Sequence, residues 1–276
     1  MTIRGACENE MSCTNIGGRV LLAILAACSF GLPVFAQKKQ VRVAAASDLQ
    51  TVLPEIASAF EARTGQPVEV VYGSSGNFYA QIQNGAPFDV FLSADSDYPR
   101  KLEETGFAEP RTAVVYGLGR IVLWMRTNSY CNPERDGWKC LLLQEVKRIG
   151  VANPKHAPYG RAAIAALQKA GIYEQVRAKL VFGENISQAA QFAESGNAQA
   201  AILAYSLMSS PSLRSGNKWE IPRELYPPIE QSAVVLKSGQ NRSAAQEFVK
   251  FITQGRGHDL LEKCGFWPPE RNQRTP

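Results

Sequence analysis

Short apolar runs alternate with amphipathic segments along most of this 276-residue chain, and this pattern restricts its fold strongly. The first pair is an apolar run at Val41–Ala46, typical of a buried strand, followed by Leu49, Val52, Ile56 and Phe60 at helical spacing. The same reasoning predicts strands at 68–72, 89–92, 120–125, 148–152, 200–204 and 233–236, and helices at 74–83, 99–105, 161–170, 186–194 and 243–252. Strands that alternate with helices indicate an α/β protein with mostly parallel sheets.

Composition excludes several classes of protein. Apolar residues make up 45% of the chain and charged residues 20%, which is ordinary for a globular protein. The net charge is +5, but Lys and Arg are scattered rather than gathered in a run, which argues against a nucleic-acid partner. No Gly-x-Ser-x-Gly motif occurs and neither histidine lies in a recognisable catalytic motif, so the sequence does not predict an enzyme.

The first 36 residues predict export to the periplasm. Arg19 precedes an apolar stretch at 20–31, and small residues then lead to an expected cleavage site after Ala36, as in a secretory signal peptide. The apolar stretch is too short for a comfortable membrane span. An alternative interpretation is lipid modification of Cys28, which would anchor the mature chain to a membrane. In both cases the remainder of the chain is expected to be exported.

Export changes the interpretation of the cysteines. Cys131 and Cys140 flank a turn-rich loop at 132–137, and an oxidising compartment favours a disulfide between them. A zinc site is not indicated, because neither histidine lies at ligand spacing from this pair.

Small and hydroxyl-bearing residues follow three of the predicted strands, at 46–48, 73–77 and 153–160. In open α/β sheets, ligands bind beyond the carboxyl ends of the strands, close to the starts of the next helices. Those starts present unpaired N–H groups and a partial positive charge, which suits an anion. The residues alone therefore predict a receptor for an anion or another polar ligand.

Five segments occur in a distinctive order and spacing between residues 41 and 266: Ala44-Ala45-Ala46-Ser47-Asp48-Leu49, Gly73-Ser74-Ser75-Gly76, Gly85-Ala86-Pro87-Phe88-Asp89-Val90-Phe91-Leu92-Ser93-Ala94-Asp95, Asn153-Pro154-Lys155-His156-Ala157-Pro158-Tyr159-Gly160-Arg161-Ala162-Ala163, and Gly265-Phe266. Together they resemble the molybdate-binding proteins of ABC importers, within the periplasmic binding protein superfamily. The resemblance implies a fold of two α/β lobes with a ligand cleft between them. We expect residues 37–117 and 231–276 to form lobe I and residues 118–230 to form lobe II, with chain crossings near 116–120 and 228–233.

Carried over residue by residue, the resemblance implies five ligand-binding residues: Ser47, Ser75, Tyr159, Ile186 and Tyr205. The two serines are expected to donate through hydroxyl and backbone groups. Tyr159 and Ile186 are expected to donate through backbone N–H groups at helix starts, and Tyr205 through its hydroxyl. Asp48 is a further expected donor through its backbone N–H. Its carboxylate is expected to turn away and cap the following helix, because it would repel an anion.

The resemblance also implies a function. We expect the chain to bind molybdate or tungstate, without a cofactor, and to deliver it as a monomer to an ABC permease and its ATPase. Molybdenum enters such a site only as part of the oxyanion. The runner-up interpretation is a receptor for another tetrahedral oxyanion, such as sulfate or phosphate, because a fold alone does not fix the ligand.

Overall fold

The computed structural model describes residues 40–127 and 129–269. The chain divides into two units, 1–37 and 38–276, and every described residue belongs to the second. The expected signal segment at 1–36, with its cleavage site after Ala36 and the alternative lipid site at Cys28, lies outside the described residues. Within the described ranges, no helix has the length and apolar character needed to cross a membrane.

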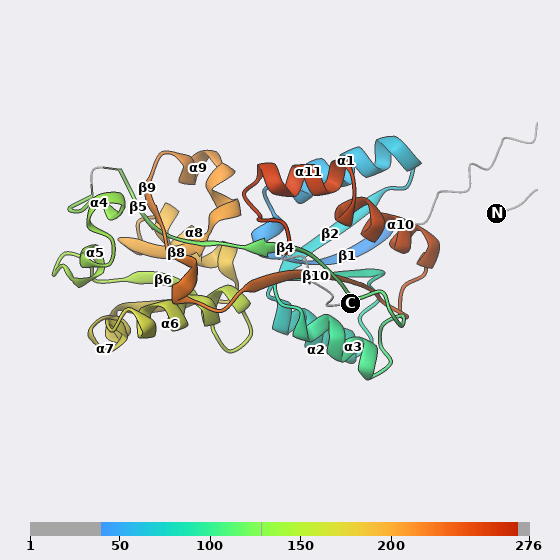
Figure 1. Cartoon of the computed structure of the whole chain (residues 1–276), viewed down its shortest axis with the longest axis horizontal. Helices are drawn as coiled ribbons and strands as arrows, with labels where there is room; N and C mark the ends of the chain where they lie inside the picture. Colours follow the sequence, from blue (N-terminus) through green and yellow to red (C-terminus); the bar gives the residue numbers. More distant parts are fainter. Residues whose placement is uncertain (1–39, 128, 270–276) are drawn as a thin grey trace, which may run out of the picture. The chain divides into compact units, whose positions relative to one another are not determined.

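The first sheet has the strand order β2-β1-β3-β10-β4. Strand β1 runs parallel to β2 and β3, whereas β10 is antiparallel to β3 and β4. Figure 1 shows α1, α10 and α11 on one face of this sheet and α2 and α3 on the other. The strands are β1 (Val41–Ala46), β2 (Val68–Gly73), β3 (Val90–Ser93), β4 (Val114–Gly119) and β10 (Ile229–Val235), and the helices are α1 (Leu53–Thr64), α2 (Ser75–Gln83), α3 (Asp97–Glu104), α10 (Arg242–Thr253) and α11 (Arg256–Lys263). We call this sheet and its helices lobe I.

The second sheet has the strand order β7-β6-β8-β5-β9, with β6 parallel to β7 and β8 and with β5 antiparallel to β8 and β9. We call this sheet and its helices lobe II. Its strands are β5 (Ile121–Met125), β6 (Ile149–Ala152), β7 (Leu180–Gly183), β8 (Ala200–Ala204) and β9 (Asn217–Glu220), and its helices are α4 (Pro133–Asp136), α5 (Lys139–Leu142), α6 (Pro158–Lys169), α7 (Tyr173–Val176), α8 (Ile186–Glu194) and α9 (Pro211–Arg214). Four short 3-10 helices complete the two lobes: η1 (Ser47–Leu49), η2 (Arg177–Lys179), η3 (Tyr205–Ser209) and η4 (Arg223–Leu225).

Apolar periodicity explains why these elements form and how they pack. In lobe I, Ile56 and Phe60 recur on one face of α1, and Phe60 packs edge-on against Phe248 of α10, with ring centroids 5.0 Å apart. In lobe II, small alanines on α6 and α8 pack closely against a sheet whose strands β5, β6 and β8 are buried along their whole length. Strands buried on both faces are typical of α/β proteins. The predicted α/β architecture is confirmed.

A single residue joins the two sheets at their first connection. β4 ends at Gly119 and β5 begins at Ile121, so that only Arg120 lies between them (Figure 1). The chain returns through residues 221–228 into β10. Residues 118–119 lie in β4 and residues 229–230 lie in β10, so both pairs belong to the sheet of lobe I. They were expected in lobe II, and each boundary therefore differs from the expected one by two residues. The division into independent lobes itself stays a prediction.

Arg120 ties the connection to three other segments. Its Nε donates to the carbonyl of Gly265 at 2.7 Å, and its Nη1 lies 3.1 Å from both carboxylate oxygens of Glu220. The guanidinium also stacks on the ring of Tyr205, 3.6 Å from its centroid. Because Gly265 follows the last helix of lobe I and Glu220 ends a strand of lobe II, Arg120 links both lobes at the point where the chain passes between them.

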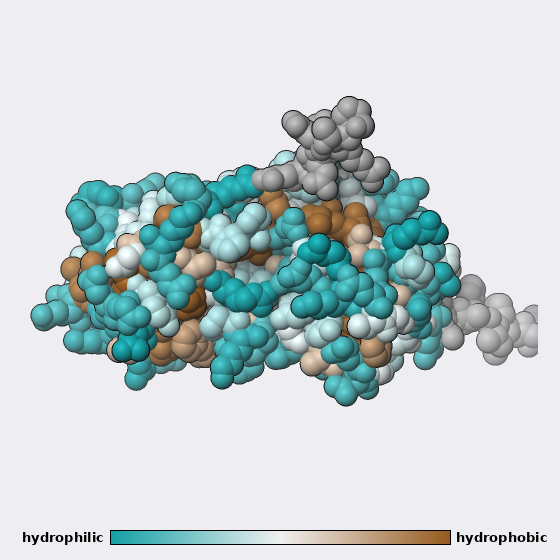
Figure 2. Space-filling model, turned by 60° about the horizontal axis from the view of Figure 1, so that its bottom comes forward, coloured by the Kyte–Doolittle hydropathy of each residue, from teal (hydrophilic) through white to brown (hydrophobic). Residues whose placement is uncertain are grey.

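The described surface offers few large apolar side chains. Figure 2 shows hydrophilic residues over most of one face. Among the described residues, the exposed large hydrophobic side chains are Val71, Tyr130, Leu142 and Phe182. They belong to four different segments, namely β2, the loop before α4, α5 and β7. Apolar residues that are exposed singly are normal on a soluble protein.

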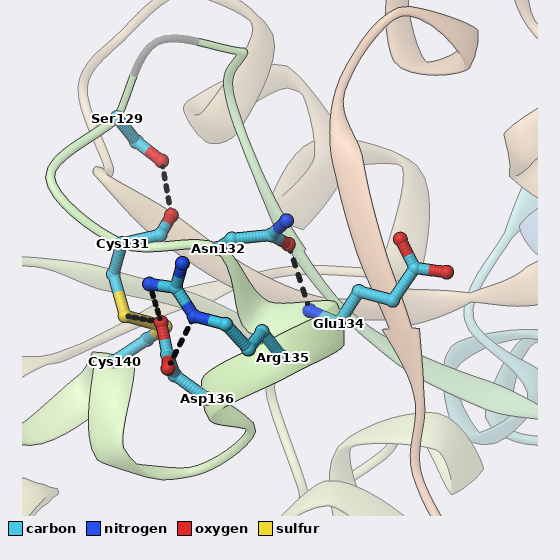
Figure 3. Close-up of a disulfide and its surroundings, with 7 residues drawn as sticks. All are labelled: Ser129, Cys131, Asn132, Glu134, Arg135, Asp136 and Cys140. Carbon is cyan, nitrogen blue, oxygen red and sulfur yellow. Dashed lines mark hydrogen bonds and ion pairs between the residues drawn. A yellow bond between two sulfur atoms is a disulfide. The ribbon is translucent and has the colours of Figure 1, made fainter.

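Cys131 and Cys140 form a disulfide in the structure, with their Cα atoms 5.5 Å apart (Figure 3). The loop between them is built locally: the side chain of Asn132 accepts the N–H of Glu134 at 3.0 Å and so caps α4. Cys140 is fully buried in lobe II. The third described cysteine, Cys264, is free and half-buried.

Replacing both cysteines of this loop with alanine is expected to lower the free energy of unfolding by about 2–3 kcal/mol, because the unfolded chain regains the freedom of a short closed loop. Urea unfolding of the exported protein measures this. Ligand affinity should not change, since the loop does not line the cavity described below. Cys264→Ala is the control that removes a thiol without a crosslink. Equal stability of the double variant and the wild type, or two free thiols in the exported wild type, would contradict the prediction.

Candidate functional site

A small cavity lies between the two lobes. It is lined by four short segments, 46–48 and 73–75 from lobe I and 157–159 and 185–186 from lobe II, together with Ala94. Its volume is about 10 Å³, far below the roughly 300–1,000 Å³ of pockets that hold drug-sized ligands. This volume excludes a drug-sized organic ligand from the cavity.

A second cavity, of about 270 Å³, shares Ala94 and Pro158 with the first. Its lining includes the carboxylates of Asp95, Asp97 and Glu230 and one cation, Arg161, which is paired with Asp95. Carboxylates repel an anion, so the larger space is the poorer candidate for an anion site. The small cavity is the candidate functional site.

Three helices begin at the small cavity, and each presents a backbone N–H at its first turn. These groups belong to Ser75 of α2, Tyr159 of α6 and Ile186 of α8. The first N–H groups of a helix have no partner inside it. The N–H groups of the next residues, Gly76, Gly160 and Ser187, donate to His156, Ala157 and Ser47. Within residues 40–127 and 129–269, none of the N–H groups of Ser75, Tyr159 and Ile186 has a hydrogen-bond acceptor. Three unpaired donors and three positive helix ends thus meet at one small space, which favours an anion.

Two serine hydroxyls add donors to this set. The Oγ of Ser75 accepts the N–H of Ala94 at 3.0 Å, and the Oγ of Ser47 accepts the N–H of Ser187 at 3.4 Å. Both serines are buried and line the cavity. Neither hydroxyl donates a hydrogen bond to another described residue, so its proton is available to a ligand.

Hydrogen bonds between the lobes close the cavity around this space. The N–H of Gly76 donates to the carbonyl of His156 at 2.9 Å, and the Oγ of Ser74 lies 3.0 Å from Nδ1 of the same histidine. On another side, Ser206 of lobe II donates to the carbonyl of Asp48 at 2.7 Å. The structure is therefore that of a closed cleft.

Asp48 is the one acidic side chain among the residues that line the cavity. It is completely buried, and its Oδ2 accepts the hydroxyl proton of Tyr159 at 2.9 Å. Burial raises the pKa of the Asp48 carboxyl to about 7, although the hydrogen bond from Tyr159 acts in the opposite direction. Its Oδ1 has no hydrogen-bond partner in the described structure. Near neutral pH the carboxyl is thus divided between its acid and carboxylate forms, instead of being fully ionised.

The family model described as bacterial extracellular solute-binding protein matches residues 41–267. The chain belongs to this family. The molybdate-binding protein ModA of Rhodobacter capsulatus is 39% identical to it over 86% of this chain and 91% of the relative. ModA of Azotobacter vinelandii is 39% identical over 84% and 91% of the two chains. Among solved structures, the periplasmic molybdate-binding protein of Azotobacter vinelandii matches with a TM-score of 0.78 at 31% identity, covering 84% of this chain and 100% of that one.

The expected periplasmic-binding-protein fold is confirmed by this match. The relatives are solute-binding proteins rather than enzymes. In this solute-binding protein, the structure brings together four of the five expected site residues, Ser47, Ser75, Tyr159 and Ile186, at one cavity. It also places Asp48 there, with its backbone at the start of η1.

Tyr205 is the expected site residue that the structure does not bring to the cavity. It is absent from the lining, and its ring stacks on the Arg120 guanidinium at the connection between the lobes. Its backbone N–H donates to the carbonyl of Arg120 at 2.9 Å. The tyrosine hydroxyl that lies in the cleft belongs instead to Tyr159, which was expected to act through its backbone alone.

The expectation that the Asp48 side chain caps the following helix is wrong. The N-cap of α1 is Val52, and no side chain caps that helix or η1. The carboxyl instead turns inward, where its Oδ2 accepts the hydroxyl proton of Tyr159 at 2.9 Å.

Sequence reasoning also missed the residues that close the cleft. His156 and Arg161 do not line the small cavity. His156 nevertheless contacts both Ser74 and Gly76 of the other lobe, and Arg161 forms an ion pair with Asp95. No local pattern predicts such contacts, because each one joins segments more than 60 residues apart.

Proposed function

We propose that this solute-binding protein captures molybdate or tungstate in the periplasm and delivers it to the permease and ATPase of an ABC importer. The observation that carries the proposal is the convergence of donors: three unpaired helix-start N–H groups and two serine hydroxyls surround a cavity for one compact ligand. The relatives named molybdate-binding proteins, at 39% identity over most of the chain, support the choice of anion.

The donor set also supports selectivity for a fully deprotonated anion. The proposed ligand-binding groups belong to Ser47, Ser75, Tyr159 and Ile186, and each donates a hydrogen bond. Hydrogen phosphate brings a proton that needs an acceptor, and an unmet donor weakens binding. Sulfate has the same charge and shape as molybdate but is smaller. We propose that it does not contact the donors of both lobes at once.

Export and assembly complete the proposal. We propose that residues 1–36 direct the chain to the periplasm, with cleavage after Ala36 or lipid modification at Cys28 as the two routes. We also propose that the protein acts as a monomer, which its few singly exposed apolar side chains support.

A Ser-His-Glu series at the cleft does not change this proposal. Ser74 contacts His156, whose Nε2 lies 3.5 Å from Glu184, so the three residue types match those of a hydrolytic triad. However, the Ser74 hydroxyl accepts the N–H of Asn77 as the cap of α2, and Glu184 is mostly exposed. A capping serine and a solvated carboxylate do not make an activated nucleophile. We propose binding without catalysis.

Calorimetric titration with molybdate, tungstate, sulfate and phosphate tests the proposed function. Molybdate and tungstate should bind tightly, and small-angle scattering should show the lobes closing with these two anions only. A ligand shifts the equilibrium between the open and closed states only as far as its affinity for the two states differs. An anion that contacts one lobe weakly should therefore leave the cleft open. Sulfate that binds as tightly as molybdate would favour the runner-up function, a receptor for another tetrahedral oxyanion.

A further inference from the structure

Asp48 occupies an unusual position for an anion-binding cavity. It lines the cavity, it is completely buried, and only one of its two carboxyl oxygens has a partner. Among the described residues, its Oδ1 is one of two buried side-chain polar atoms without a hydrogen bond. Buried polar atoms normally have partners, so an unmet one beside a ligand cavity indicates that the ligand satisfies it.

A directed chain of hydrogen bonds fixes the role of each Asp48 oxygen. The hydroxyl of Tyr116 donates to Oε1 of Gln231 at 3.4 Å, and Nε2 of Gln231 donates to the Tyr159 hydroxyl at 3.3 Å. Because the Tyr159 oxygen accepts this N–H, its own proton goes to Oδ2 of Asp48. Oδ2 is therefore an acceptor. In a neutral carboxyl the proton then sits on Oδ1, the oxygen without a partner in the protein.

The surroundings of Asp48 supply no positive charge. Facing it are the phenols of Tyr116 on β4 and Tyr159 on α6, and Tyr226 acts in turn on Tyr159. Burial raises the pKa of both Tyr116 and Tyr159, which keeps them neutral. The helices packed against η1 present hydroxyls, from Ser187 and Ser206. Across the described residues, no lysine, arginine or histidine, His156 included, is among the groups that act on Asp48.

An ionised carboxylate beside a bound dianion would be strongly repulsive in a buried site. We propose that Asp48 binds the oxyanion as a neutral carboxylic acid whose Oδ1–H donates a hydrogen bond to it, so that capture of the anion is coupled to uptake of one proton. The proton comes from the solvent and forms the O–H bond on Oδ1 as the cleft closes. This inference rests on the proposed function, because it needs an anionic ligand.

The coupling has a definite sign. In the open cleft Asp48 is solvated and ionised at neutral pH, with an ordinary pKa of about 4. In the closed cleft burial raises this pKa to about 7, and a bound dianion raises it further. Between these two values the closed state holds one more proton than the open state. Linkage then makes the dissociation constant rise about tenfold for each unit of increasing pH.

Calorimetry of the full exported protein with molybdate tests this coupling. At pH 6, titrations in two buffers of different ionisation enthalpy should show uptake of close to one proton per anion. Between pH 5 and 6.5 the dissociation constant should rise about tenfold per pH unit. Asp48→Asn replaces the acid with a permanent amide donor, so it should bind molybdate with neither proton uptake nor this pH dependence. Asp97→Asn, at an exposed carboxylate on α3, is the control and should behave as the wild type.

Each outcome decides the inference. Wild-type binding without proton uptake would overturn it, as would proton uptake that persists in a folded Asp48→Asn variant. If the variant does not fold, infrared difference spectra of the wild type decide: molybdate should produce a protonated carboxyl band, and its absence would overturn the inference. If the wild type binds no molybdate in any buffer, the proposed function fails, which is a distinct result.

Discussion

Gly76→Ala is expected to weaken molybdate binding by about 10- to 100-fold while leaving the ligand-free protein at least as stable as the wild type. A Cβ at Gly76 would lie 2.8 Å from both the Cβ and the carbonyl oxygen of His156, in the opposite lobe. Backbone atoms cannot move aside as a flexible side chain can, and overpacking of this kind amounts to about 1–3 kcal/mol. Only the closed cleft contains this contact. In the open state alanine is a better helix former than glycine, so α2 should gain slightly.

Two measurements separate these effects. Thermal unfolding without ligand should show no loss of stability, and calorimetry with molybdate should show the loss of affinity. Asn77→Ala is the control, because it introduces alanine at the next, exposed position of the same helix. Wild-type affinity in Gly76→Ala would mean that the ligand-bound cleft does not close as far as the structure shows.

Ile186→Pro should weaken molybdate binding by about 10- to 150-fold, the equivalent of one hydrogen bond to a charged acceptor. Proline has no N–H, so this change deletes the proposed donor at the start of α8. The position is otherwise suited to proline: it is the first residue of a helix, where no intrahelical bond is lost. The preceding Asn185 is extended, with φ −150° and ψ 177°, which is compatible with a following proline.

Ile186→Pro removes both the N–H and the isoleucine side chain, so the effect of each loss must be distinguished. Ile186 is 4% exposed, so its loss reduces packing, and thermal unfolding reports that part of the effect. Ile186→Val trims the same side chain but keeps the N–H, and it should bind molybdate almost as the wild type does. Unchanged affinity in a folded Ile186→Pro variant would remove this N–H from the site.

Local patterns predict most of the regular elements. The predicted helix at 186–194 and the predicted strand at 200–204 match α8 and β8 at both ends. Three strands were missed, β4, β7 and β9. In β4 two glycines, which are depleted in strands, interrupt the apolar residues, and β9 is polar and only half-buried. Neither therefore forms the unbroken apolar run that marks a buried strand. The order of strands in the sheets depends on contacts distant in sequence, which local periodicity does not report.

The residues of the site also fall into those that the sequence predicts and those that depend on distant contacts. Ser47, Ser75, Tyr159 and Ile186 follow strands or begin helices, so their neighbourhood could be predicted from the chain order and the family resemblance. The environment of Asp48 could not, because it depends on Tyr159, which lies 111 residues away. The position of Tyr205 likewise depends on Arg120, a residue whose contacts come from three separate segments.

Three of the proposed ligand-binding donors are backbone N–H groups at helix starts. This determines which substitutions, insertions and deletions the site tolerates. Every residue except proline supplies this N–H, so other substitutions at Tyr159 or Ile186 that keep the helix leave the donor in place. A single-residue insertion or deletion in the turns before α6 or α8 would instead shift each amide by one position along the helix and rotate it away from the cavity. We therefore expect the length of the turns before α6 and α8 to vary less than the residue type at position 186. At Tyr159 the hydroxyl that donates to Asp48 also restricts the residue type.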